Sequence, residues 1–346
     1  MQLLRRVFAC SSLVAIAGCL LLFAASDAPQ SKISLVGSGS NVPINLYTAW
    51  TEEFNKNNTS IQVRYLSMST MEGIRQISEG SGDFAAGEIP LSKEQMHGGK
   101  VSLVQLPTVI VGIVPIYNLP GTPDLYFSGE VLAQIYLGTI KNWKDSRVAK
   151  LNPGASLPDL PIEVVHRTPG KGSNYIFSDF LSKTSPEFRA QVGKSASPKW
   201  PVGMEANRGE EMVEKVSAHP GAIGYVELNF ARRSDIGYGS VQNSAGRFVR
   251  ATADTITAAC KAVEKSIPAD FNVSMTEAPG KNSYPIASFT WIYVPASGAP
   301  AERSRAVKQF LSWGLSDGQE MARGMGYATL PTSILSKAKA TLNSVQ

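Results

Sequence analysis

From residue 32 onward, the chain alternates short apolar runs with segments that repeat apolar residues at helical spacing. The clearest helical segment spans residues 44–54, where Tyr47, Trp50 and Phe54 recur at i, i+3 and i+7. In this first part of the chain the pattern predicts strands at residues 33–36, 61–65, 84–86 and 101–106, and helices at 44–54 and 73–77. Strands that alternate with helices in this way indicate an α/β fold with parallel sheets and helices on both faces.

Two longer apolar, β-branched runs at residues 107–117 and 287–294 predict fully buried strands. The other predicted elements are helices at 129–137, 174–181, 303–313 and 332–342, and strands at 162–165 and 222–226. We interpret the two long strands as hinge crossings of a two-lobed molecule. Lobe 1 then comprises residues 31–112 and 289–346, and lobe 2 comprises residues 113–288.

The N-terminal 30 residues are typical of an export signal. Arg5 and Arg6 precede an apolar stretch at 7–25, and small residues at 24–26 favour signal-peptide cleavage. Alternatively, the sequence IAGC at 16–19 resembles a bacterial lipobox, in which Cys19 would carry a lipid. A third possibility is an uncleaved membrane anchor, although the stretch is short for that purpose. All three interpretations place the rest of the chain in the periplasm or the cell envelope.

Composition narrows the class of protein. A chain of 346 residues with 43% apolar and 18% charged residues is typical of a soluble globular protein with two domains. Its net charge of +5 comes from scattered basic residues, so no nucleic-acid-binding patch is expected. Only one cysteine, Cys260, lies beyond the N-terminal segment, and the three histidines have no metal-ligand spacing. We therefore expect neither a metal site nor a cofactor.

Three short segments rich in small and polar residues share one form: each follows a predicted strand and opens a helix. They lie at residues 37–43, 67–73 and 170–174. Backbone N–H groups at a helix N-terminus are unpaired and carry partial positive charge, so they bind anions. One such segment alone looks like an ordinary helix cap, and three together favour an anion site without establishing it.

Two charged residues extend this pattern. Arg167 ends a predicted strand just before the third segment, where it can hold an oxyanion in a bidentate manner or form an ordinary ion pair. Glu88 follows a strand of small residues, where it can accept the proton of hydrogen phosphate or lie in solvent. No GxSxG motif, complete P-loop frame or activated nucleophile is present, so an exported phosphatase is disfavoured and no enzyme is expected.

Several short motifs follow one another along the chain: GSG at 37–39, DFA at 83–85, PLS at 90–92, PTVI at 107–110, NLPG at 118–121, IYLG at 135–138, LNPG at 151–154, WPVG at 200–203, PGAIGYVE at 220–227 and YATLP at 327–331. In these motifs the chain resembles a known family, the periplasmic phosphate-binding proteins of high-affinity phosphate ABC transporters. The resemblance implies the type II periplasmic-binding-protein fold, two α/β lobes joined by two hinge strands with the ligand in the cleft between them. It also implies a protein that binds inorganic phosphate and delivers it to the membrane permease of an ABC importer, and a monomer, because one chain forms the site.

The resemblance also implies the ligand residues, which are Ser40, Asn41, Val42, Thr70, Glu88, Arg167, Lys171, Gly172 and Ser173. The departures from the family include five positions. Asn41-Val42 replaces Thr-Phe, Glu88 replaces an aspartate, Pro169 replaces the aspartate that partners the arginine, and Lys171 replaces a hydroxyl residue. Lys171 is expected to pair with Glu88 or with the anion. Because Lys171 adds a cation and Pro169 removes a carboxylate, the cleft becomes more positive than that of the family. A different oxyanion, another small anionic solute or a role as an anion sensor therefore stays open as an alternative.

Overall fold

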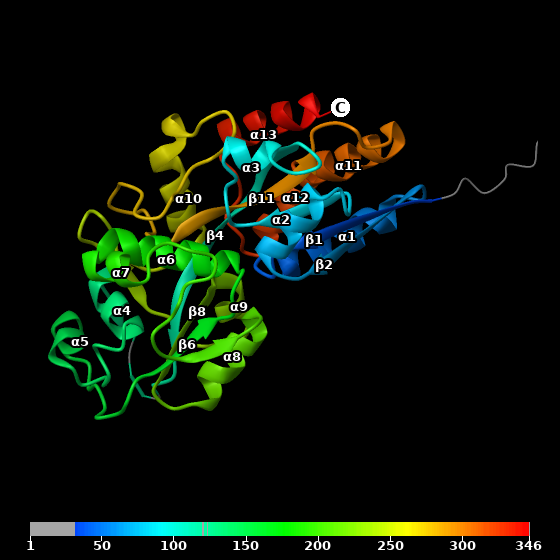
Figure 1. The fold of residues 1–346 in the computed structure, drawn as a ribbon. Coiled ribbons are helices and arrows are strands. Elements are labelled where there is room, and N and C mark those ends of the chain that lie inside the picture. Colours follow the sequence, from blue (N-terminus) through cyan, green and yellow to red (C-terminus); the bar gives the residue numbers. More distant parts are fainter. Residues whose placement is uncertain (1–31, 120, 123, 346) are drawn as a thin grey trace, which may run out of the picture. The chain divides into compact units, whose positions relative to one another are not determined.

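A computed structural model describes residues 32–119, 121–122 and 124–345 (Figure 1). Eight strands form one mixed sheet in the order β2-β1-β3-β11-β4-β8-β6-β7. These strands are β1 (Ile33–Gly39), β2 (Ile61–Ser67), β3 (Phe84–Gly87), β4 (Leu103–Tyr117), β6 (Glu163–Arg167), β7 (Met204–Ala206), β8 (Ala222–Glu227) and β11 (Ala287–Pro295). A small second sheet contains β5 (Tyr126–Phe127), β9 (Ser240–Gln242) and β10 (Phe248–Val249).

Strands β4 and β11 run side by side through the middle of the sheet. The first part of β4, from Leu103 to Gly112, pairs with β11, and its last five residues, from Ile113 to Tyr117, pair with β8. This change of partner coincides with the lobe boundary expected after residue 112. The boundaries themselves stay a prediction.

The expected break between a strand at 101–106 and another at 107–117 is wrong, because the chain forms one continuous strand there. Pro107 has no N–H to donate to a neighbouring strand. The structure accommodates it at a register shift between Thr290 and Trp291 of β11, where Trp291 pairs with Pro107 and Thr290 with Val109. Strand pairing in the rest of this region therefore continues on both sides of the proline.

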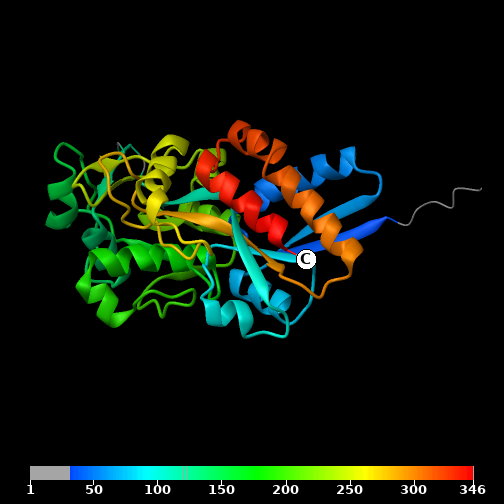
Figure 2. The same cartoon turned by 90° about the horizontal axis from the view of Figure 1, so that it is seen from above.

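Helices cover the sheet on both faces. They are α1 (Ile44–Asn57), α2 (Thr70–Ser78), α3 (Lys93–His97), α4 (Gly129–Tyr136), α5 (Ser146–Leu151), α6 (Gly172–Thr184), α7 (Pro186–Gln191), α8 (Gly209–Ala218), α9 (Leu228–Arg233), α10 (Ala253–Val263), α11 (Ala301–Gly314), α12 (Asp317–Gly324) and α13 (Thr332–Ser344), with a short 3-10 turn at Glu264–Ser266. Figure 2 shows the C-terminal helix α13 lying beside α11. The apolar face predicted for α1 is buried, including Tyr47, Trp50 and Phe54.

The expectation of purely parallel sheets is only partly met. Strand β1 is parallel to β2 and β3, and β6 is parallel to β7 and β8. The central strands β4 and β11 are antiparallel to each other and to their outer neighbours β8 and β3. Periodicity reports that a strand is buried but not its direction, which is why the sequence did not reveal this mixture.

The predicted export signal, including Cys19, lies outside the described residues. Within residues 32–119, 121–122 and 124–345, no helix combines the length and apolar character needed to cross a bilayer.

Candidate anion-binding site

The three small-residue segments occupy the positions that the sequence predicted. They connect β1 to α1, β2 to α2 and β6 to α6. Glu88 directly follows β3, and Arg167 is the last residue of β6. Because β1, β2 and β3 are parallel neighbours, their carboxyl ends lie at one edge of the sheet and bring the first two segments and Glu88 together.

Glu88 is fully buried and is held by three hydroxyl groups. Its Oε2 accepts hydrogen bonds from Ser40 Oγ at 2.6 Å and Thr70 Oγ1 at 3.3 Å, and its Oε1 accepts one from Thr290 Oγ1 at 3.2 Å. Burial raises the pKa of Glu88 to about 7, while the three hydroxyls and the charge of Arg167 act in the opposite direction. A solvated glutamate, the alternative considered from sequence, is therefore excluded.

The third segment contacts Glu88 and the second segment directly. Gly172 N–H, at the start of α6, donates to Thr70 Oγ1 at 3.1 Å, and Met71 N–H donates to Gly170 C=O at 3.1 Å. Glu88 lies so close that a Cβ on Gly172 would be 2.0 Å from Glu88 Oε2. The residue after it, Ser173, has a buried hydroxyl with no hydrogen-bond partner among the described residues.

Arg167 is a buried cation without a carboxylate partner. Arg167 is only 3% exposed, and among the described residues it takes part in no ion pair. Its Nη2 donates to the carbonyl of Asn207 at 2.8 Å, while its Nε is buried without a partner. Burial lowers the pKa of Arg167, and the nearby groups that raise it, including Tyr225 and Glu88, do not reverse that effect.

The backbone around Arg167 is fixed by an aromatic residue on the neighbouring strand. Tyr225 of β8 accepts the Arg167 N–H through its hydroxyl at 3.1 Å and donates to Asn174 Oδ1 of α6. Asn174 in turn donates to the carbonyl of Thr168 at 2.9 Å. These contacts hold the end of β6 against the start of α6, and they fix the position of Arg167 relative to Ser173.

Lys171 does not pair with Glu88, which corrects one of the two expectations for it. Lys171 Nζ donates instead to Asn207 Oδ1 at 2.7 Å. Burial and the charge of Arg167 lower the pKa of Lys171 to about 8. Pro169, where the family has an aspartate, offers no negative charge, so Asn207 is the shared neutral partner of both cations.

The first segment plays a more structural role than expected. The Val42 N–H donates to Ser40 Oγ at 3.1 Å, so it is already paired within the segment. Asn41 donates from Nδ2 to Ser67 Oγ at 3.3 Å and accepts from the N–H of Gly209 at 2.8 Å. Among the predicted residues, Ser40 and Thr70 contact Glu88, whereas the side chains of Asn41 and Lys171 contact the segment from Asn207 to Gly209.

The sequence missed two contributors to the site. Thr290 is the one hydrogen-bond partner of Glu88 on β11, and a hydroxyl residue within an otherwise apolar predicted strand was the available signal. Asn207 lies between β7 and α8, so it belongs to a fourth segment that connects a strand to a helix. The helical repeat of Met212, Val213 and Val216 would have predicted α8 and drawn attention to the residues before it.

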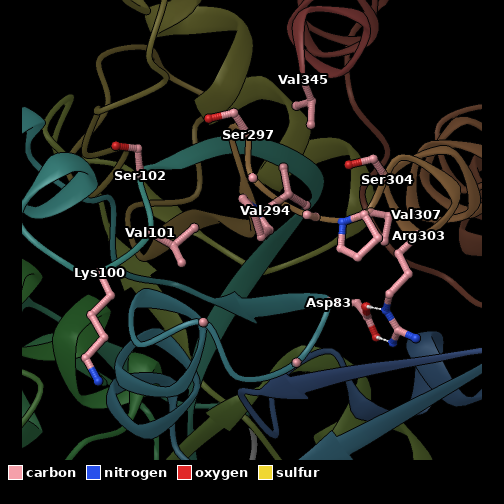
Figure 3. Close-up of a pocket in the computed structure, with 16 residues that line it drawn as sticks. Asp83, Lys100, Val101, Ser102, Val294, Ser297, Arg303, Ser304, Val307 and Val345 are labelled. Atoms are coloured by element: carbon pink, nitrogen blue, oxygen red, sulfur yellow. Dashed lines mark hydrogen bonds and ion pairs between the residues drawn. The ribbon is translucent and has the colours of Figure 1, made fainter.

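A separate cavity of about 580 Å³ contains none of the predicted ligand residues (Figure 3). Its wall includes Asp83, Lys100 and Arg303, and Figure 3 shows the paired contacts of the Asp83 carboxylate with the Arg303 guanidinium, at 2.7 and 2.8 Å. Asp83 also accepts the N–H of Val36 on β1. These contacts fasten α11 to the sheet. In the described part of the chain, no group of three His, Cys, Asp or Glu side chains is arranged to hold a metal.

Comparison with known proteins agrees with the geometry. Residues 24–318 match the model of the PBP superfamily domain. The phosphate-binding protein PstS of Xylella fastidiosa is 34% identical, over 91% of this chain and 86% of that protein, and PstS of Pasteurella multocida is 34% identical, over 92% and 93%. The fold matches an ABC-type phosphate transport receptor from Vibrio cholerae (18% identity, TM-score 0.59, 86% of this chain and 100% of that one) and a high-affinity periplasmic phosphate-binding protein, PfluDING, with bound phosphate (18%, 0.69, 89% and 93%). The chain therefore has the type II periplasmic-binding-protein fold and belongs to the PBP superfamily, within the family of the PstS phosphate-binding proteins.

Proposed function

We propose that this protein binds inorganic phosphate between its two lobes and delivers it to the membrane permease of a phosphate ABC importer. The observation that carries the proposal is the buried Arg167, which has no carboxylate partner among the described residues and an unpaired Nε. An uncompensated buried charge costs several kcal/mol. A bound oxyanion removes this cost, because its oxygens accept charge-assisted hydrogen bonds from the guanidinium.

The unpaired hydroxyl of Ser173 and the N-terminus of α6 would supply further hydrogen-bond donors to the anion. Ser173 is 1% exposed, so its hydroxyl has no access to bulk solvent in this conformation. A helix N-terminus beside it adds partial positive charge. Together with Arg167, these groups favour an anion with several acceptor oxygens.

Glu88 supports phosphate over fully ionised oxyanions. A carboxylate offers about four acceptor positions, and hydroxyls occupy three of those of Glu88. The remaining position, on Oε1, suits the proton of hydrogen phosphate. Sulfate carries no such proton, so it would face a negative charge without a hydrogen bond.

The proposed site contains the residues expected from sequence, with different roles, and the side chain of Asn41 contacts protein atoms on both sides of its amide group. Arg167, Ser173 and Gly172 would contact the anion, Glu88 would read its proton, and Ser40 and Thr70 would position Glu88. Val42 would close the wall of the site, and Lys171 would raise its positive potential. Lys171 adds a positive charge relative to the family, and Pro169 removes a negative one. Binding of a different oxyanion or another small anionic solute, or a role as an anion sensor, is therefore the second candidate.

We also propose that the protein carries out no chemistry on its ligand and acts in the periplasm or cell envelope after export. Its relatives bear the names of binding proteins and transport receptors, and one is called periplasmic. Export would end either in signal-peptide cleavage near residues 24–26 or in attachment of a lipid to Cys19, and mass spectrometry of the processed N-terminus distinguishes the two.

The test is calorimetric titration of the purified, ligand-free protein with phosphate, arsenate and sulfate. We expect saturable one-to-one binding of phosphate and arsenate and rejection of sulfate. The variant Arg167→Ala should lose at least about 100-fold in phosphate affinity, since a buried charge-assisted contact is removed. The matched control is Arg75→Ala, because Arg75 lies on the surface of α2 in ion pairs with Glu72 and Glu79. Phosphate binding that survives in Arg167→Ala, or that never occurs in the wild type, would contradict the proposal.

A further inference from the structure

Asn41 joins two segments that are 168 positions apart in the sequence. Its Oδ1 accepts a hydrogen bond of 2.8 Å from the N–H of Gly209, the first residue of α8, and its Nδ2 donates to Ser67 Oγ at the end of β2. Asn41 is 5% exposed, so the contact with Gly209 is shielded from water. A shielded amide group thus connects the β1–α1 segment with α8.

Helix α8 has no cap of its own at this position. Its N-cap residue, Arg208, makes no side-chain hydrogen bond to the helix. The first N–H groups of a helix have no partner within the helix and are normally satisfied by a side chain of the preceding residue or by water. Here the N–H of Gly209 receives its acceptor from Asn41, on the segment between β1 and α1.

The segment before α8 also binds the side chains of the two cations of the site, Arg167 and Lys171. Two positions before Gly209, the carbonyl of Asn207 accepts from Arg167, and its Oδ1 accepts from Lys171. The Asn207 N–H is fixed by Glu211 of α8 at 2.7 Å. A movement of the segment from Asn207 to Gly209 therefore acts on the cations and on the contact with Asn41 together.

We propose that Asn41 is a closure latch, which caps α8 from the opposite lobe and slows opening of the cleft after the anion is bound. The inference rests on the proposed function, since it assumes that the anion occupies the site next to Arg167. Asn41 is a positioning residue in this proposal and does not contact the anion. Both ends of its amide group are engaged with protein atoms, unlike the unpaired groups of Arg167 and Ser173.

The test compares wild type with Asn41→Ala and Asn41→Asp, each expressed from the full-length chain and purified. Phosphate association and dissociation rates are measured by stopped flow. Asn41→Ala should release phosphate on the order of tenfold faster, the effect of losing one buried hydrogen bond, with its association rate within about twofold of wild type. Asn41→Asp keeps the acceptor oxygen and places a negative charge at a helix N-terminus, so its release should be slower than that of Asn41→Ala.

Two further measurements separate a latch from a general structural role. The melting temperature of ligand-free Asn41→Ala should stay near that of wild type, whereas its phosphate-bound form should melt lower than the wild-type complex. Hydrogen exchange at the Gly209 amide, followed with and without phosphate, should be faster in Asn41→Ala than in wild type wherever the cleft is closed.

The outcomes are distinct. Unchanged phosphate release in Asn41→Ala, or equal Gly209 exchange in both proteins under all conditions, would overturn the latch. A loss of binding as complete as in Arg167→Ala would also overturn it, because Asn41 would then be a direct ligand. If wild type fails to bind phosphate, the proposed function fails, and the Gly209 exchange comparison still decides whether Asn41 caps α8.

Discussion

The Glu88 carboxylate lies against the N-terminus of α6, and the absence of a side chain at Gly172 is what permits this approach. A Cβ at Gly172 would be 2.0 Å from Glu88 Oε2 and 2.8 Å from Thr70 Oγ1. Distances this short between unbonded atoms are strongly repulsive. The contact joins the segment after β3 to the segment after β6, so it links the two sides of the proposed phosphate site.

The substitution Gly172→Ala should therefore hold the two segments apart. We expect a loss of at least about 100-fold in phosphate affinity by calorimetry, since the donors could no longer converge on one anion. The folded state with the segments separated should remain accessible, so the circular dichroism spectrum should be unchanged. The matched control is Gly324→Ala at the end of α12, where a Cβ would meet no atom within 4 Å. Equal affinities of the two variants would contradict the assignment of Gly172 to the site.

Glu88 should make the stability of the ligand-free protein depend on pH. Burial raises the pKa of Glu88 from its ordinary value of 4.5 to about 7, so folding favours the protonated form. The stability that this group contributes is full below pH 4.5 and is lost as the pH rises through 7. The difference corresponds to about 3 kcal/mol at 1.36 kcal/mol per pKa unit.

The measurement is the free energy of unfolding of wild type and Glu88→Gln between pH 4.5 and 8. Glutamine has a similar shape and does not titrate, so the difference between the two proteins isolates Glu88 from other buried acids such as Glu227, whose pKa burial raises to about 8. Wild type should lose stability relative to Glu88→Gln as the pH rises. A constant difference would show that Glu88 does not titrate in this range.

The same substitution tests anion selectivity. Glu88→Gln can donate a hydrogen bond through its amide, so we expect sulfate to bind measurably and phosphate to bind more weakly. In wild type, sulfate rejection should weaken below pH 7, where Glu88 becomes protonated and can itself donate. Competition titrations at pH 5.5 and 8 measure this ratio. Undiminished rejection of sulfate by Glu88→Gln at both pH values would assign selectivity to other residues.

Lys171 should add an alkaline limit to phosphate binding. Burial and Arg167 lower the pKa of Lys171 to about 8, so its charge is lost as the pH rises above 8. Phosphate affinity of the wild type should fall several-fold between pH 8 and 9.5, and Lys171→Gln should bind more weakly at pH 7 but show no such fall. Lys56→Gln, at an exposed position on α1, serves as the control. Identical pH profiles in wild type and Lys171→Gln would remove Lys171 from the electrostatics of the site.

The ion pair of Asp83 and Arg303 should contribute to stability without affecting the site. Asp83 accepts two hydrogen bonds from Arg303 and one from Val36, so Asp83→Ala removes the acceptor of the partly buried Val36 N–H and the carboxylate partner of Arg303. We expect a loss of about 1–3 kcal/mol in the free energy of unfolding by denaturant titration. Phosphate affinity should stay within about twofold of wild type. A large loss of phosphate affinity in Asp83→Ala would mean that the ion pair beside the cavity in Figure 3 influences the proposed phosphate site.

Residues whose role depends on local chain chemistry were predictable from the sequence. Hydrophobic periodicity located α1, β3 and the long central strands, and small residues after strands located the segments that open α1, α2 and α6. Short elements such as α9, with six residues, and β7, with three, gave no such signal, because so few residues do not repeat a helical or strand period. The positions of Arg167 and Glu88 at strand ends suggested an anion site, and the motif resemblance added the expectation that both are ligand residues.

What the sequence by itself determined is the alternation of strands and helices, the burial of the central strands and the residue types that suit an anion. The tertiary structure alone decided which of these residues meet. It paired Lys171 with Asn207 instead of Glu88, brought Thr290 to Glu88 across 202 positions, and placed Asn41 at the N-terminus of α8. The physical reason is that hydrogen bonds and buried charges depend on distances of a few ångströms between segments far apart in the chain, and such distances are fixed only when the sheet assembles.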